Sequence, residues 1–121
     1  MKIVDLLKRE SVELNGKVTS KPEAIEKMVA LMTAGGNLAD VEAYKKGVFA
    51  REEESTTGIG EGIAIPHAKT AAVKAPGLAA MVVKDGVDYD SLDGEPAKLI
   101  FLIAAPDTED NVHLEVLSRL S

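Results

Sequence analysis

The sequence predicts an α/β fold in which a single mixed β-sheet is covered by helices on both faces. Two observations lead to this prediction. Residues 78–83 and 99–105 are apolar at both odd and even positions, a pattern typical of strands that are buried on both faces. Segments with helical spacing of apolar residues stand before and after them. With 121 residues and no internal repeat, the chain is expected to form one domain, residues 1–121, with one core.

The first half of the chain predicts two helices. Residues 3–7 indicate a short helical turn, and residues 11–14 alternate weakly, as an edge strand does. Ser20 and Glu23 form a capping box that opens a helix, and Gly35-Gly36 ends it. A second helical pattern leads into the charged residues 51–54. The apolar positions that define the two helices are Ile25, Met28, Val29 and Met32, then Leu38, Val41, Tyr44, Val48 and Phe49.

The second half predicts three strands and a last helix. Residues 63–65 form a short strand that Pro66 ends, and the two apolar runs supply the other strands. Asp85-Gly86 and Asp93-Gly94 are typical of hairpin turns. A helical pattern with Val112, Val116 and Leu120 on one side begins near residue 110. The pattern reaches Ser121 with no C-terminal capping signal, so we expect the fold to lack its C-terminal helical segment.

Composition narrows the class of protein. The net charge of −6 opposes binding to nucleic acid, and an aromatic content of 3% leaves little surface on which bases or sugars could stack. The absence of cysteine excludes a disulfide framework and a thiolate site. The longest apolar run, residues 99–105, is far shorter than the roughly 20 residues of a membrane-spanning helix, and the N-terminus has no secretory signal. We therefore expect a cytoplasmic protein.

Three alternate glycines, Gly58, Gly60 and Gly62, raise the question of a phosphate-binding loop. A dinucleotide fingerprint needs its third glycine at position 63, where the chain has isoleucine, and its loop opens a helix instead of a strand. No Gly-Lys-Ser/Thr sequence is present to form a P-loop. The glycines are better explained by a tight turn packed closely beside the following strand.

The two histidines are the candidate reactive groups. His67 follows a predicted strand at its carboxyl end, where open α/β sheets place ligands, and His113 lies in the first turn of the last predicted helix. A single histidine in such a position is more often a solvated residue than a reactive one. If strands 63–65 and 99–105 are parallel neighbours, the two imidazoles converge. Two histidines make a weak metal site, whereas one attacking phosphorus and one stabilising charge make a phosphoryl-transfer site.

The residues around His67 carry a family likeness. The stretch TGIGEGIAIPH at 57–67, preceded by Arg51-Glu52 and followed by HLEVL at 113–117, resembles the enzyme IIA domain of the fructose/mannitol class of the bacterial phosphoenolpyruvate-dependent sugar phosphotransferase system. PHAKT at 66–70, VDYDSLDG at 87–94 and IAAP at 103–106 are most similar to the fructose-specific branch. The resemblance covers essentially the whole chain.

The resemblance implies a phosphorelay without metal or organic cofactor. It implies that Nε2 of His67 accepts a phosphoryl group from the phosphocarrier protein HPr and passes it to a cysteine of enzyme IIB, which serves the membrane enzyme IIC. His113 is then expected beside His67, and Arg51 near the site. Arg51 either supplies charge to the phosphoryl oxygens or pairs with a neighbouring glutamate. Glu61 either orients an imidazole or holds its loop, and the directions of Lys69 and Thr70 are left open.

Two other functions stay open. A regulatory module of the same fold would be phosphorylated as a signal to a transcription factor or other regulator. A purely structural domain would carry incidental histidines on opposite sides of the fold. The sequence names neither the sugar nor the context of the domain, free or fused to IIB and IIC. The sequence is also compatible with a homo-oligomer formed through Val112, Val116 and Leu120.

Overall fold

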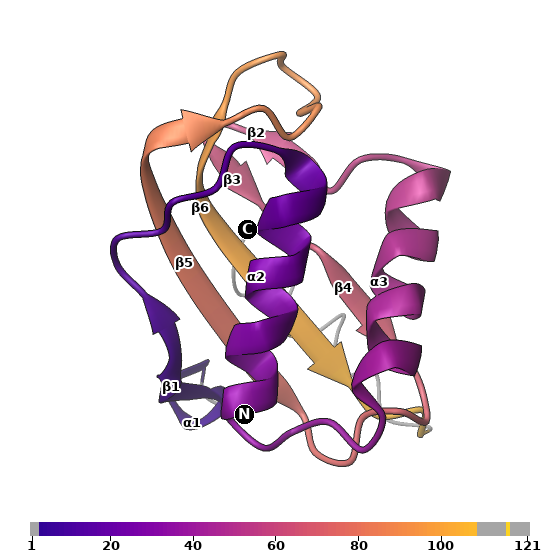
Figure 1. The fold of residues 1–121 in the computed structure, drawn as a ribbon. Helices are drawn as coiled ribbons and strands as arrows, with labels where there is room; N and C mark the ends of the chain where they lie inside the picture. Colours follow the sequence, from indigo (N-terminus) through magenta and orange to yellow (C-terminus); the bar gives the residue numbers. More distant parts are fainter. Residues whose placement is uncertain (1–2, 109–115, 117–121) are drawn as a thin grey trace.

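The fold of this chain is described by a computed structural model, for residues 3–108 and 116. Their helices and strands, in chain order, are α1 (Ile3–Leu6), β1 (Leu7–Glu13), α2 (Lys21–Ala34), α3 (Val41–Glu54), β2 (Gly58–Gly60), β3 (Ile63–Ala64), β4 (His67–Lys69), β5 (Gly77–Val87) and β6 (Ala97–Ala105). The strands form one six-stranded sheet in the order β1-β5-β6-β3-β2, with β4 also paired to β6 (Figure 1).

The sheet is mixed, as predicted. The two apolar runs form its antiparallel centre, β5 with β6, and β1 joins β5 in parallel. β3 and β4 both run parallel to β6 along its other side. β6 is therefore the strand that joins the two halves of the sheet.

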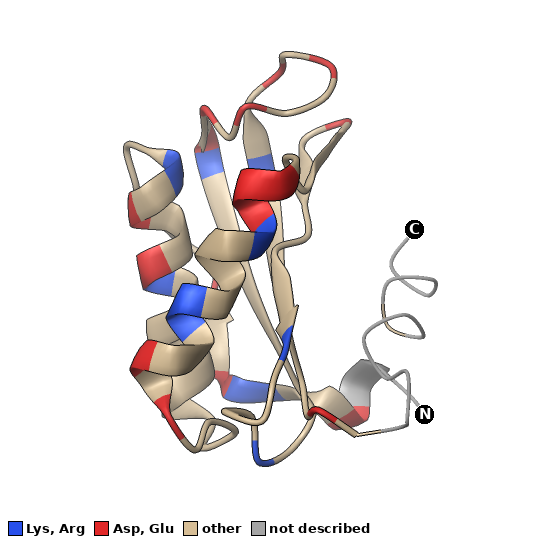
Figure 2. Cartoon of the chain, turned by 90° about the vertical axis from the view of Figure 1, so that its right-hand side faces the viewer, with Lys and Arg blue, Asp and Glu red and all other residues tan. Residues whose placement is uncertain are grey.

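Helices α2 and α3 lie side by side over one face of the sheet (Figures 1 and 2). The predicted N-cap is confirmed, because Ser20 Oγ accepts a hydrogen bond from the Glu23 N–H at 3.2 Å. The reciprocal half of the capping box differs by one residue, since Glu23 Oε1 accepts at 2.7 Å from the N–H of Thr19, which precedes the cap. The α2 residues Ile25, Met28 and Met32 are buried in the main core against this face. The helical periodicity of the sequence thus identifies the buried stripe.

The opposite face carries a second apolar cluster. Its buried members are Ile65, Leu78, Ile103 and Val116, and Leu6 at the end of α1 packs against them. Because successive residues of a strand point to opposite faces, Ile103 belongs to this cluster while Leu102 and Ala104 belong to the main core. Apolar residues from outside the sheet thus cover both of its faces, as the uninterrupted apolar runs predict.

The turn prediction at Asp85-Gly86 is wrong. β5 continues through these residues to Val87, and no hairpin forms there. The pairing instead slips, because Val82 faces Leu99 and Val87 faces Ala97 on β6. Gly86 absorbs this irregularity with a φ of 76°, in the left-handed region that glycine reaches easily. The predicted turn at Asp93-Gly94 is confirmed, since Gly94 N–H donates to Ser91 O at 3.0 Å.

The glycine-rich stretch contains a strand as well as a turn. Gly58–Gly60 pairs antiparallel with β3, and the chain reverses at Glu61-Gly62 with positive φ angles of 56° and 81°. A Cβ on Gly58 would lie 2.4 Å from Ser91 Oγ, so this glycine permits a close approach between β2 and the loop after β5. The role assigned to these glycines from the sequence, a tight turn with close packing, agrees with this geometry.

None of the helices within the described residues combines the length and the apolar character required to span a membrane.

Tyr44 ties α3 to β6 and provides a first prediction. Its buried hydroxyl donates to Ile103 O at 2.7 Å, and burial raises the pKa of Tyr44 well above its ordinary value, so the donor keeps its proton. Tyr44→Phe leaves that carbonyl without this donor and is expected to lower the free energy of unfolding by about 1–2 kcal/mol. Urea unfolding measures this loss, and the slope of the free energy of unfolding against urea concentration should stay unchanged as the control. An unaltered urea midpoint would show that the hydrogen bond from Tyr44 does not stabilise the fold.

Asp93 provides a pH prediction. Its carboxylate accepts hydrogen bonds from the N–H of Glu61 at 2.9 Å and of Glu95 at 3.0 Å, and these bonds, that from Glu61 first, lower the pKa of Asp93 below its ordinary value. A carboxyl with a lowered pKa in the folded state stabilises the loop above its unfolded pKa. That contribution is lost as the pH falls through the lower folded value.

Amide chemical shifts of Glu61 and Glu95, followed by NMR from neutral to acidic pH, are therefore expected to titrate together, with a midpoint below the ordinary pKa of an aspartate. Asp93→Asn should remove this titration. A midpoint at or above the ordinary value would show that the two hydrogen bonds do not hold the loop.

Candidate functional site

The candidate site lies where the edge pairing along β6 is interrupted. Ile63 pairs with Leu99 and His67 pairs with Ile103, so β3 and β4 keep one register along β6. This confirms that strands 63–65 and 99–105 are parallel neighbours. Between β3 and β4, Pro66 has no N–H to donate, and its carbonyl accepts a hydrogen bond from Ile103 N–H at 3.1 Å. The break in the strand therefore leaves the chain in place on β6 and starts β4 with His67.

A backbone carbonyl orients the His67 ring. Nδ1 lies 3.0 Å from Ile65 O. Because a carbonyl oxygen only accepts hydrogen bonds, Nδ1 must carry the proton and donate it. In the neutral imidazole the lone pair then belongs to Nε2. This is the tautomer required for nucleophilic attack through Nε2.

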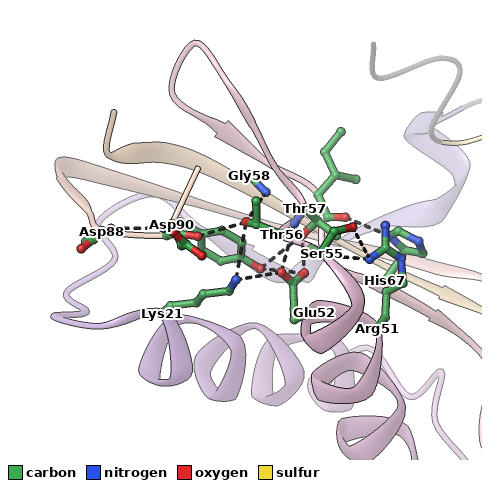
Figure 3. A network of polar contacts seen from close by, with 12 residues as sticks. Lys21, Arg51, Glu52, Ser55, Thr56, Thr57, Gly58, His67, Asp88 and Asp90 are labelled. Atoms are coloured by element: carbon green, nitrogen blue, oxygen red, sulfur yellow. Dashed lines mark hydrogen bonds and ion pairs between the residues drawn. The ribbon is translucent and has the colours of Figure 1, made fainter. Parts of the chain in front are cut away.

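His67 is half-buried and lines an open groove of about 360 Å³ between α3 and β4. Arg51 and Glu54 of α3 line the same groove, and Figure 3 shows the Arg51 side chain next to His67. Arg51 Nη1 donates to Ser55 O at 3.0 Å, which holds the guanidinium at the end of α3. The structure thus brings His67 and Arg51 together along one groove.

Lys69 also lines this groove. It lies two residues after His67 on β4, so both side chains belong to the same face of the strand. The sequence left the direction of Lys69 open because the strand at 67–69 was not predicted. Its spacing from His67 is the signal that would have identified it, once residue 67 is known to begin a strand.

Glu61 lies elsewhere. It lines a different pocket, together with Asp85 and Lys98, and its N–H is bonded to the Asp93 carboxylate. Ile63, two residues after Glu61, and His67 pair with β6 residues four strand steps apart, which is about 13 Å. The structure therefore gives Glu61 a place in the β2–β3 turn, and it does not gather Glu61 with His67 and Arg51.

Sequence reasoning missed a buried polar network behind the groove (Figure 3). Glu52 Oε1 accepts from Thr57 N–H at 3.0 Å and lies 3.1 Å from Lys21 Nζ. Glu52 Oε2 accepts from the Tyr89 hydroxyl at 3.2 Å and from the Thr57 hydroxyl. Burial, and then the Glu52 charge, raise the pKa of Tyr89 far above its ordinary value, so Tyr89 remains a donor. This network joins the end of α3 to the segment that enters β2.

The convergence of His113 with His67 stays a prediction, because His113 lies outside the described residues. Val116, three positions further along the chain, is described and packs with Ile65 and Ile103. Within residues 3–108 and 116, no group of three or more histidine, aspartate or glutamate side chains is placed to hold a metal ion.

Comparisons with known proteins extend this description. Residues 5–121 match the family model for the phosphoenolpyruvate-dependent sugar phosphotransferase system, EIIA 2. The chain is 53% identical to the fructose-specific EIIABC component of the Bacillus subtilis phosphotransferase system, over 100% of this chain and 19% of that protein. The chain thus spans about a fifth of the length of that relative.

Solved structures share the fold. The nitrogen regulatory protein IIA-Ntr of Neisseria meningitidis has a TM-score of 0.84 at 32% identity, covering 96% of this chain and 79% of that one. The mannitol enzyme IIA of Escherichia coli, in its complex with phosphorylated enzyme IIB, has a TM-score of 0.81 at 28% identity, covering 95% and 80%. The match of the family model extends over the His67 motif, the groove and the whole sheet. The chain therefore belongs to the EIIA 2 family of the phosphoenolpyruvate-dependent sugar phosphotransferase system.

Proposed function

We propose that this chain is a phosphohistidine carrier domain that accepts a phosphoryl group on Nε2 of His67 and passes it on during sugar uptake. The observation that carries the proposal is the hydrogen bond from Nδ1 of His67 to Ile65 O, which puts the lone pair of the neutral ring on Nε2. The donor is HPr and the acceptor is a cysteine of enzyme IIB. The sugar is fructose, by similarity to the fructose-specific EIIABC component.

The same hydrogen bond serves both directions of transfer. When Nε2 attacks phosphorus, the N–P bond forms as the bond from phosphorus to its donor breaks. Nδ1 keeps its proton throughout, so the product is a phosphoimidazole with a protonated ring. Such a ring is a good leaving group, and the acceptor thiolate displaces it while the N–P electron pair returns to Nε2. His67 thereby regains its starting tautomer without a separate proton shuttle.

Positive charge in the groove stabilises the transferring group. Arg51 and Lys69 line the groove beside His67, and a phosphoryl group in transfer spreads negative charge over its outer oxygens. Glu54 lines the same groove and opposes them, as does the net charge of −6. Both partners must therefore carry basic residues of their own to the site, as in a charge-complementary encounter.

The arrangement of partners is supported by the relatives. The Bacillus subtilis relative is an EIIABC component, and the Escherichia coli mannitol enzyme IIA was solved with phosphorylated enzyme IIB. An accessible nucleophile at the rim of a sheet suits two proteins that use the same nitrogen in turn. We propose that residues 1–121 act as the IIA domain of such a relay and that it operates in the cytoplasm.

A regulatory role is the second candidate, because the fold also matches that of a nitrogen regulatory protein. Such a module would be phosphorylated at His67 but would signal to a transcription factor or other regulator. Onward transfer separates the two functions. A carrier loses its phosphoryl group rapidly to fructose enzyme IIB, whereas a regulatory module keeps it.

His67 and His113 provide the direct test. Incubation with phosphoenolpyruvate, enzyme I and HPr is expected to add one acid-labile phosphoryl group, detected by intact mass, and His67→Ala should abolish it. His113→Ala should slow the addition about ten-fold or more without abolishing it, since a residue that stabilises charge does not itself attack. Equal phosphorylation of His67→Ala and the unmodified chain would refute the proposal, and an unphosphorylatable, folded His113→Ala would refute the role of His113.

Arg51 and Glu61 form a contrasting pair of variants. Arg51→Gln removes a cation from the groove and is expected to slow phosphoryl transfer to His67 by about ten-fold or more. Glu61→Gln keeps the backbone N–H that Asp93 accepts and should leave the rate unchanged. Single-turnover transfer from phosphorylated HPr measures both. A slow Glu61→Gln beside a normal Arg51→Gln would reverse their assignments.

A further inference from the structure

Thr57 and Ile65 form an incomplete antiparallel pair at the end of β2. Gly58 pairs with Ala64, and one step outward Ile65 N–H donates to Thr57 O at 2.9 Å. In a hydrogen-bonded antiparallel pair the two residues exchange both bonds, so Thr57 N–H would ordinarily donate back to Ile65 O. Pro66 favours an extended Ile65, and the N–H and C=O of an extended residue point to the same side, so both groups of Ile65 are expected on the Thr57 side.

The second bond of this pair is replaced by two others. Thr57 N–H donates to Glu52 Oε1 at 3.0 Å, and Ile65 O accepts from His67 Nδ1 at 3.0 Å. The Glu52 carboxylate thus replaces the acceptor of the missing ladder bond, and the His67 imidazole replaces its donor. Thr57 is buried, so its N–H needs an acceptor in any arrangement of the chain. Without Glu52, the acceptor that the antiparallel pairing offers this N–H is Ile65 O, where it would compete with the His67 ring.

We infer that Glu52 is a positioning residue that keeps His67 in the Nδ1–H tautomer by withdrawing Thr57 N–H from the Ile65 carbonyl. The inference rests on the proposed function only for its catalytic consequence, namely that Nε2 is the attacking atom. The chain of contacts runs from Glu52 through Thr57 and Ile65 to the ring, and each step is a hydrogen bond between described residues.

The surroundings of Glu52 suit this role. Lys21 at 3.1 Å compensates its charge, and the hydroxyls of Tyr89 and Thr57 occupy Oε2. These contacts leave Oε1 directed at Thr57 N–H in a fixed position, because the Glu52 side chain is only 5% exposed. Glu52 also follows Arg51 directly on α3. One helix end therefore supplies a cation to the groove and an acceptor to the strand behind it.

The experiment measures the His67 tautomer in the unphosphorylated chain by ¹⁵N NMR with labelled histidine. At a pH where the imidazole is neutral, protonated and unprotonated ring nitrogens have distinct shifts. A His113→Gln spectrum assigns the two histidines of the chain. The unmodified chain is expected to show Nδ1 protonated and Nε2 unprotonated.

Glu52→Leu removes the acceptor and is expected to shift the tautomer ratio of His67 toward Nε2–H by about five-fold, the effect of one ordinary hydrogen bond. Glu52→Gln retains one oxygen and should shift the ratio in the same direction by about two-fold. If Glu52→Leu does not fold, the tautomer ratio of Glu52→Gln tests the inference. Glu53→Leu, at an exposed neighbouring glutamate, is the matched control for lost charge and should leave the ratio unchanged. An unaltered ratio in the folded Glu52 variants would overturn the inference.

Phosphorylation by HPr is measured separately on the same variants. If the proposed function holds, the initial rate should fall in proportion to the loss of the Nδ1–H tautomer, and raising the concentration of phosphorylated HPr should not restore it. If the unmodified chain accepts no phosphoryl group, the proposed function fails. The tautomer ratio still tests the role of Glu52, because it is measured without phosphorylation. A normal tautomer ratio with slow transfer would refute the role of Glu52 in positioning His67.

Discussion

The site depends on one constraint, the pairing of residues 63–69 along the edge of β6 in a single register that is interrupted at Ile65-Pro66. Proline cannot donate to a ladder, so the chain leaves the strand conformation there without losing its alignment with β6. The interruption turns the Ile65 carbonyl into an acceptor for His67. A continuous strand would place the histidine on the same edge but would give its ring no fixed tautomer.

The helices over the sheet hold the rest of the groove relative to this strand. Tyr44 joins α3 to the carbonyl of Ile103, the residue that pairs with His67 on β6. Arg51 lies two helical turns further along α3, and Ser55 holds its guanidinium. The same β6 residue therefore fixes both walls of the groove. Placing the nucleophile and the positive charge in advance is the main contribution a protein can make to phosphoryl transfer.

Local features of the fold could be predicted from the sequence. The N-cap at Ser20, the uninterrupted apolar runs and the strand end at Pro66 each reflect forces that act within a few residues. The pair Asp85-Gly86 has the same composition as a hairpin turn, yet β5 continues through it because a bulge makes equal use of a glycine with positive φ. Composition alone does not separate these two uses of glycine.

The parts that could not be predicted depend on contacts between distant residues. β4 is only His67–Lys69, too short for a periodic pattern, and it exists because β6 offers an edge. Glu52 is surrounded in the sequence by charged neighbours, and only Thr57, Tyr89 and Lys21 together explain its burial. The candidate histidine followed from a motif, whereas its orienting contacts required the fold.

The central claim is that the backbone orients His67 so that Nε2 reacts. The most direct measurement is ¹⁵N and ³¹P NMR of the phosphorylated chain with labelled histidine. The structure predicts coupling of phosphorus to Nε2 of His67, with the proton on Nδ1 retained and protected from exchange by Ile65 O. Phosphorus bonded to Nδ1 of His67, or to any other residue, would contradict it.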